Sequence, residues 1–124
     1  MGILSGVFGS KSENKEIPKI NWIQLTNEGQ LEDLKKTSVL FKHSTRCGIS
    51  SSVIKRFEKQ HGSAETNVDF YYLDLLNFRN ISQAIAEKFQ VIHESPQAVV
   101  IKNNELVAHA SHYDILELNL VALD

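Results

Sequence analysis

The single cysteine of this 124-residue chain, Cys47, is the residue best suited to covalent chemistry. It lies in the stretch HSTRCGIS, residues 43–50, between a polar loop and a segment with helical periodicity. Amide groups at the start of a helix and the neighbouring cation Arg46 favour the thiolate form of such a thiol, which is the nucleophile in thiol exchange. Ser50 lies one helical turn later, where its hydroxyl could donate to the sulfur. The pattern predicts a reactive thiol, and the alternative is a buried, unreactive cysteine.

The elements that position this thiol alternate between strand and helix patterns. Runs of apolar, β-branched and aromatic residues predict strands over residues 20–25, 38–43 and 67–75, and a closing hairpin over residues 97–111. Helical spacing predicts helices over residues 27–36, 48–61 and 80–90, followed by a last helix. We expect Asn80 to cap the third helix, Ser111 and Asp114 to open the last one, and Asn103–Asn104 to form the hairpin turn.

The predicted order is therefore βαβαβαββα, which indicates an α/β protein. Parallel strands joined by right-handed crossovers, with an antiparallel closing hairpin, give a central mixed sheet flanked by helices. This is the element order of the thioredoxin-like fold, and Cys47 falls where that fold keeps its nucleophile. We expect a flexible N-terminal arm over residues 1–18 and one thioredoxin-like domain over residues 19–124.

A proline before a later strand is the second feature of chemical interest. The stretch HESPQAVVI places Pro96 before a predicted strand, where proline costs no ladder hydrogen bond. In thioredoxin-like proteins a cis-proline at this point brings the main chain of the preceding residue, here Ser95, against the catalytic sulfur. An extended client chain can pair with that main chain like an added strand. Pro96 alone indicates a turn, but together with Cys47 it predicts a docking edge.

Composition narrows the class of protein. The chain is 42% apolar and 23% charged, with a formal net charge of -2, as in ordinary soluble globular proteins. Lys and Arg do not cluster with aromatic residues, so we expect no nucleic-acid partner. No apolar run approaches the ~20 residues of a membrane helix, and the first residues do not match a secretory signal. We therefore expect a cytoplasmic monomer without a membrane partner, in a compartment that keeps lone thiols reduced.

Histidines are the remaining candidates for site chemistry. His109 and His112 are close in sequence, but without a further Cys or His cluster we expect no metal site. His43 could assist the thiolate, although its place at a polar strand end is the simpler explanation. His93 and Glu94 precede Pro96, and we expect them mainly to shape that loop, with contact to a thiol ligand as the alternative.

Three stretches, FKHSTRCGIS, YYLDLLNFRNIS and HESPQAVVIKN, together resemble the YtxJ family, the monothiol bacilliredoxins of bacterial bacillithiol metabolism. The resemblance spans about residues 20–122. It implies that Cys47 is the nucleophile and Pro96 the cis-proline. The positions that match the surrounding motif are Thr45, Arg46 and Ser50.

The residue after the cysteine leaves two kinds of thiol chemistry open. Family members usually have proline there, where this chain has Gly48, and CGIS is also similar to the CGFS motif of monothiol glutaredoxins, which bind iron–sulfur clusters using glutathione. One alternative is thus a cluster carrier, in which two Cys47 thiolates of a dimer and two small thiols ligate a [2Fe–2S] cluster with visible absorption. Another is a non-catalytic thioredoxin-fold interaction domain, whose thiol would react slowly with iodoacetamide.

The residues and the resemblance favour a monothiol thiol-disulfide oxidoreductase. We expect Cys47 to attack the mixed disulfide between an S-thiolated client protein and a low-molecular-weight thiol such as bacillithiol, releasing the client reduced. Because the chain has no resolving cysteine, a second small thiol must regenerate Cys47. The small thiol is then a co-substrate, and we expect no bound cofactor. Ser95 and Pro96 are the residues expected to dock the client.

Overall fold

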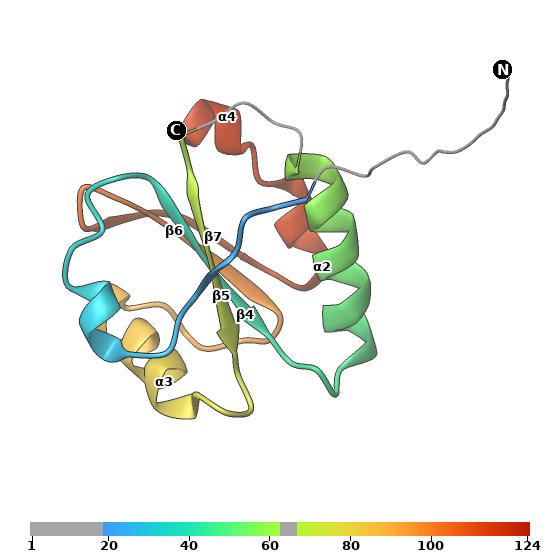
Figure 1. Ribbon diagram of the computed structural model, residues 1–124, viewed down its shortest axis with the longest axis horizontal. Helices are drawn as coiled ribbons and strands as arrows, with labels where there is room; N and C mark the ends of the chain where they lie inside the picture. The colour runs from blue at the N-terminus through green and yellow to red at the C-terminus, as the bar shows by residue number, and fades with distance from the viewer. Residues whose placement is uncertain (1–18, 63–66) are drawn as a thin grey trace, which may run out of the picture.

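A central strand, β4 (Ser38–His43), organises the computed structural model, which describes residues 19–62 and 67–124 (Figure 1). All residues of β4 are buried, because the strand lies in the middle of a five-stranded sheet with a layer of helices on each face. Apolar and β-branched side chains suit a strand covered on both faces. The sheet order is β3-β5-β4-β6-β7, and the other strands are β3 (Ile23–Gln24), β5 (Asp69–Asp74), β6 (Gln97–Lys102) and β7 (Glu105–Ser111).

The strand directions agree with the predicted mixed sheet. β3 and β4 both run parallel to β5, whereas β6 runs antiparallel to β4 and to β7. The hairpin between β6 and β7 turns at Asn103 and Asn104, both with positive φ. The predicted fold class and the predicted hairpin turn are confirmed. The arm expected over residues 1–18 lies outside the described residues.

Side chains of β4 alternate between two cores. Val39 and Phe41 face the core under α2 (Gly48–His61), η2 (His112–Glu117) and α4 (Leu120–Leu123), whereas Leu40 faces the core under η1 (Glu28–Leu31) and α3 (Arg79–Phe89). Figure 1 shows α2 and α3 on opposite sides of the sheet. None of the described helices is long and apolar enough to cross a membrane.

The α2 core is rich in aromatic rings. Phe57, fully buried on α2, packs against Phe41 at 5.2 Å between ring centroids and against Trp22 at 6.1 Å. The indole Nε1–H of Trp22 donates to the carboxylate of Glu58 at 2.7 Å. These contacts fix α2 on the sheet, and with it the residue at its start.

The helix predicted over residues 27–36 is wrong in length. Only one 3₁₀ turn forms, closed by a capping box in which Asn27 accepts from the Gly29 amide and Gln30 reaches back to the Asn27 amide. The carbonyls of Leu34 and Lys35 accept hydrogen bonds from the amides of the hairpin turn. The Leu34 amide, which a continuing α-helix would direct to the Gln30 carbonyl, instead donates to the side-chain oxygen of Asn104 at 2.6 Å, so the chain leaves the helix here.

Several predicted element ends also differ. The first strand shrinks from residues 20–25 to Ile23–Gln24, since the two-residue ladder with β5 is all that forms. Asn80 does not cap α3. The N-cap position is Phe78, and the side-chain amide of Asn80 donates to the Glu28 carboxylate. The last helix is a 3₁₀ helix without a side-chain cap from Ser111, followed by the short α4, which Asn119 caps.

Truncation of the central aromatic side chain tests this account of the core. Phe57→Ala should lower the free energy of unfolding by about 3–5 kcal/mol, because it leaves a cavity among packed rings. Ile92→Ala is the control: that side chain is 87% exposed, and its loss should change stability by less than about 0.5 kcal/mol. Urea unfolding measures both. Equal effects of the two substitutions would contradict the packing described here.

Candidate active site

The thiol stands at the start of α2. Cys47 is the N-cap residue, with extended main-chain angles, and its side chain is half-buried. Its amide donates to the Ser44 carbonyl at 3.2 Å, and its carbonyl accepts from the Ser51 amide at 3.1 Å. Cys47 thus occupies the N-cap position of α2, although its side chain makes no capping hydrogen bond to the helix amides. Thr45 and Arg46 form the exposed turn that leads into it.

Gly48, the first residue of α2, is exposed and has no neighbour within 4 Å of the position that a Cβ would occupy. The fold thus does not require glycine here. The first helical position is one where proline also fits well. A Cβ at position 48, as proline in the usual family motif would have, therefore meets no steric conflict.

Ser50 does not contact the sulfur in the way that the sequence suggested. Its hydroxyl oxygen accepts from the Ser44 amide at 3.1 Å and lies 2.7 Å from His43 Nδ1, and within the described residues no hydrogen bond joins it to Cys47. Ser50 is fully buried, one turn into α2, so its hydroxyl points inward. It fastens the loop before Cys47 to the end of β4.

His43 is the other half of this contact. The ring is buried, and desolvation lowers the pKa of His43, although Asp74 and Glu58 oppose the shift. Burial thus favours the uncharged imidazole, which forms a hydrogen bond with the Ser50 hydroxyl. The structure assigns His43 to the support of the thiol loop.

The proline loop faces the same edge of the sheet. The Ser95–Pro96 bond is cis, Pro96 is buried, and its carbonyl accepts from the His112 amide at 3.0 Å. Among the described residues, the main-chain groups of Ser95 make no hydrogen bond, and its buried hydroxyl has no partner. Ser95 thus presents an unused main-chain donor and acceptor.

Strand directions bring these pieces together. The carboxyl ends of the parallel strands β4 and β5 and the start of the antiparallel β6 lie at one edge, where Lys42 pairs with Gln97 and His43 with Asp74. Cys47 follows β4 and the Ser95–Pro96 loop precedes β6, so both lie at this edge.

A buried lysine beside this loop was not foreseen. Lys42 is fully buried, and its Nζ lies 3.2 Å from the Ser82 carbonyl and 3.2 Å from His93 Nδ1. Burial lowers the pKa of Lys42 to about 8. A lysine inside an apolar strand is itself the sequence signal, because lysine is almost never fully buried without a partner.

The remaining histidines do not form a metal site. His109 and His112 are both exposed, and over residues 19–62 and 67–124 no group of three or more His, Cys, Asp and Glu side chains is placed to hold a metal ion.

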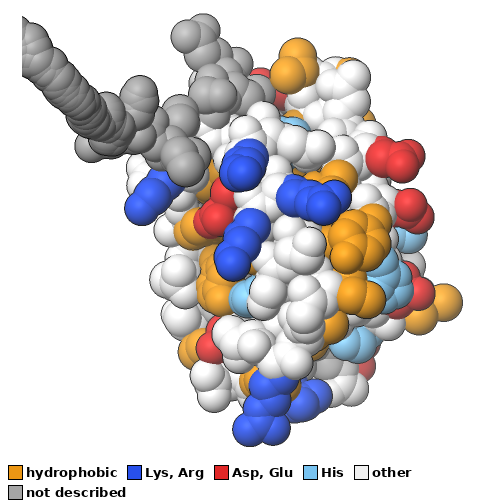
Figure 2. Space-filling model, turned by 90° about the vertical axis from the view of Figure 1, so that its right-hand side faces the viewer, with side chains coloured by type: hydrophobic (Ala, Val, Ile, Leu, Met, Phe, Trp, Pro, Cys, Tyr) orange, Lys and Arg blue, Asp and Glu red, His pale blue; other side chains and the backbone are white. Residues whose placement is uncertain are grey.

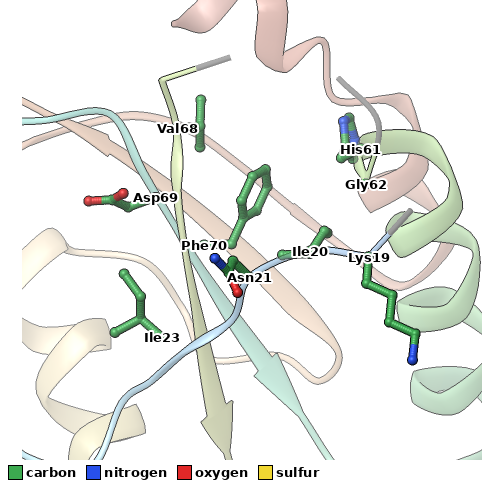
Figure 3. Close-up of a pocket in the computed structure, with 9 residues that line it drawn as sticks. All are labelled: Lys19, Ile20, Asn21, Ile23, His61, Gly62, Val68, Asp69 and Phe70. Atoms are coloured by element: carbon green, nitrogen blue, oxygen red, sulfur yellow. The ribbon is translucent and has the colours of Figure 1, made fainter. Parts of the chain in front are cut away.

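A separate cavity of about 360 Å³ lies at the other end of α2, lined by Ile20, His61 and Phe70 among others (Figure 3). A helix of 14 residues spans about 21 Å, so this cavity is remote from Cys47. Its lining contains no nucleophile of the kind found at the thiol edge.

The outer face of α2 is basic. Lys55, Arg56 and Lys59 are exposed on it, and Figure 2 shows Lys and Arg side chains gathered on this side of the molecule. This face of α2 thus carries a local concentration of positive charge.

Removal of the Ser50 hydroxyl tests its structural role. Ser50→Ala should lower the free energy of unfolding by about 1–3 kcal/mol, because the Ser44 amide and His43 lose their buried partner. Ser52→Ala on the same helix is the control, since the Ser52 hydroxyl makes no hydrogen bond among the described residues. If thermal unfolding finds the two variants equally stable, the anchoring role is wrong.

Lys42 should give stability a distinct pH dependence. Below pH 8 the folded and unfolded states both hold the proton, and the cost of the buried charge is complete. Between pH 8 and 10.5 the folded state releases its proton first, so the stability of the wild type should rise relative to that of Lys42→Met. Urea unfolding across this range measures the difference, and Lys59→Met is the exposed control. A constant difference between wild type and Lys42→Met would contradict the assignment.

Comparisons with known proteins agree with this geometry. The chain resembles a solved structure described as a candidate oxidoreductase with a thioredoxin fold, with 34% identity, a TM-score of 0.69, and coverage of 83% of this chain and 94% of that one. Two thioredoxins share the fold. The one from Malassezia sympodialis has 19% identity and a TM-score of 0.64, with coverage of 91% of this chain and 95% of that one. The one from Trypanosoma brucei brucei has 12% identity and a TM-score of 0.66, with coverage of 91% of this chain and 97% of that one. The family model described as "Monothiol bacilliredoxin BrxC" matches residues 23–120. Because that match covers most of the chain, including Cys47 and Pro96, this protein belongs to the monothiol bacilliredoxin family.

Proposed function

We propose that this thioredoxin-fold protein removes bacillithiol from S-thiolated client proteins in the bacterial cytoplasm, with Cys47 as its sole sulfur nucleophile. The observation that carries the proposal concerns positions 47 and 50. Cys47 occupies the N-cap position of α2, and the buried Ser50 lies one turn later, where a dithiol protein would have its second cysteine. Exchange at such a site must begin and end with sulfur from outside the chain.

The exchange proceeds in two balanced steps. The Cys47 thiolate attacks the bacillithiol sulfur of the mixed disulfide; the old S–S bond breaks, a new one joins Cys47 to bacillithiol, and the client leaves as a thiolate that takes a proton from water. A second bacillithiol, as its thiolate, then attacks the bacillithiol sulfur on Cys47. Cys47 is released, and the two small thiols leave as their disulfide.

In this proposal the client protein binds at the Ser95–Pro96 loop. Ser95 has its main-chain N–H and C=O unused by the described residues, directly before β6. An extended client segment around its modified cysteine can pair with these groups as an added strand. The basic outer face of α2 aids the approach of anionic thiols and clients. In this proposal the protein acts as a monomer, with the small thiol as co-substrate and no bound cofactor.

Two variants test the monothiol mechanism with a bacillithiol-capped client protein. Cys47→Ser should abolish removal of the cap, because a hydroxyl without an adjacent base is a poor nucleophile. Ser50→Cys should form an internal disulfide with Cys47 and release the client without a second small thiol. Mass spectrometry should find one bacillithiol on wild-type Cys47 and an internal disulfide in the Ser50→Cys protein.

Ser52→Cys is the matched control, because its thiol lies further along α2 and should not resolve the adduct on Cys47. Removal of the cap by Cys47→Ser at the wild-type rate would rule the mechanism out.

A further inference from the structure

A second cavity lies at the thiol edge, on the α3 face of the sheet. It has a volume of about 360 Å³ and is lined by Leu75, Arg79, Ser82, Gln83, Ala86 and His93. This size is within the range of sites for small molecules. The lining comes from the residue after β5, the first turns of α3 and the loop before Pro96. It includes neither an acidic side chain nor the sulfur of Cys47.

Hydrogen bonds fix which groups this cavity offers. Lys42 Nζ and Ser82 Oγ both lie 3.2 Å from His93 Nδ1. An ammonium group can only donate, so Nδ1 is the acceptor and the ring proton is on Nε2. His93 is exposed and lines the cavity, which leaves its Nε2–H as a donor for a ligand.

Two cations reinforce that donor. Arg79 lines the cavity and, among the described residues, forms no ion pair, while the Lys42 ammonium lies directly behind His93 without a carboxylate partner. Both cations lower the pKa of His93, after the larger effect of burial, and Glu94 opposes them more weakly. The cavity thus offers donors and positive charge beside a larger apolar surface, and the donors and the charge are the chemistry that recognises a carboxylate.

We propose that this cavity binds the carboxylate end of the small thiol while the sulfur of that thiol is exchanged at Cys47. The inference rests on the proposed function and adds to it the residues that select the co-substrate. Arg79 and the Nε2–H of His93 contact the carboxylate, and Lys42 adds its charge from behind. Gln83 supplies a further amide, and Leu75 and Ala86 border the less polar part of the ligand.

The sheet places this cavity and the sulfur at the same edge. Neighbouring strands are about 4.8 Å apart, and the cavity and Cys47 follow the adjacent strands β5 and β4 at the same edge. The loop that carries His93 leads from the cavity to Pro96 at the start of β6. The proposal thus requires a thiol whose acidic group lies several bonds from its sulfur, long enough to pass the edge of the sheet from the α2 side to the α3 side.

The experiment uses two caps on one cysteine of a short peptide. One cap is bacillithiol, whose malyl group carries carboxylates, and the other is the same thiol without the malyl group. Arg79→Gln should slow removal of the bacillithiol cap about tenfold, the effect of losing one charge-assisted hydrogen bond, and leave removal of the shorter cap unchanged. Arg79→Lys should recover part of the rate.

Lys88→Gln is the control, since it removes an exposed cation from the same helix without altering the cavity. Arg79 is exposed, so its substitution should not change the unfolding temperature. If Arg79→Gln slows the removal of both caps equally, or of neither, the carboxylate site is wrong, and the proposed thiol exchange is not affected by that result. If the wild type removes neither cap, the proposed function fails, and the inference fails with it.

Discussion

Burial of β4 on both faces is the constraint on which the thiol site depends. This strand ends at His43, and the loop that follows must turn from the middle of the sheet directly into α2. The hydrogen bonds of Ser50 to the Ser44 amide and to His43 hold that turn. Since the strand cannot slip without exposing its core residues, the position of Cys47 is set by packing that lies well behind it.

At the edge of the sheet where β4 ends, the α2 side and the α3 side carry different groups. On the α2 side the half-buried Cys47 stands at the first turn of the helix. On the α3 side Lys42 brings a positive charge into the interior, beneath the loop that carries His93. A protein with one thiol depends on a molecule from solution to complete its reaction, so recognition of that molecule is as necessary to it as the nucleophile.

The local sequence pattern was sufficient to predict most of the strands and helices. The density of apolar residues in 38–43 and 97–102 and the spacing of Val53 and Phe57 identified the central strands and α2, because these segments satisfy both propensity and burial. The position of Cys47 at the start of α2 followed from the same pattern.

What the sequence did not reveal depends on contacts between distant segments. The helix after Asn27 stops early, and the Leu34 amide then donates to Asn104 in the hairpin turn, a contact that no local signal marks. The Ser50 hydroxyl faces His43, seven residues earlier, although helical spacing alone suggested the sulfur. Lys42 and His93 are far apart in sequence, and their contact exists only once β4, α3 and the proline loop are assembled.

The placement of Trp22 has a consequence for spectroscopy. It is the single tryptophan of the chain; its ring stacks on Phe57, and its Nε1–H is bonded to Glu58, both on the helix that begins beside Cys47. Indole emission depends on the polarity around the ring and on neighbouring groups that quench it. The protein therefore carries an intrinsic fluorophore on the nucleophile's own helix, and a shift of α2 when a disulfide forms at its first turn would be visible as a change in emission without any added label.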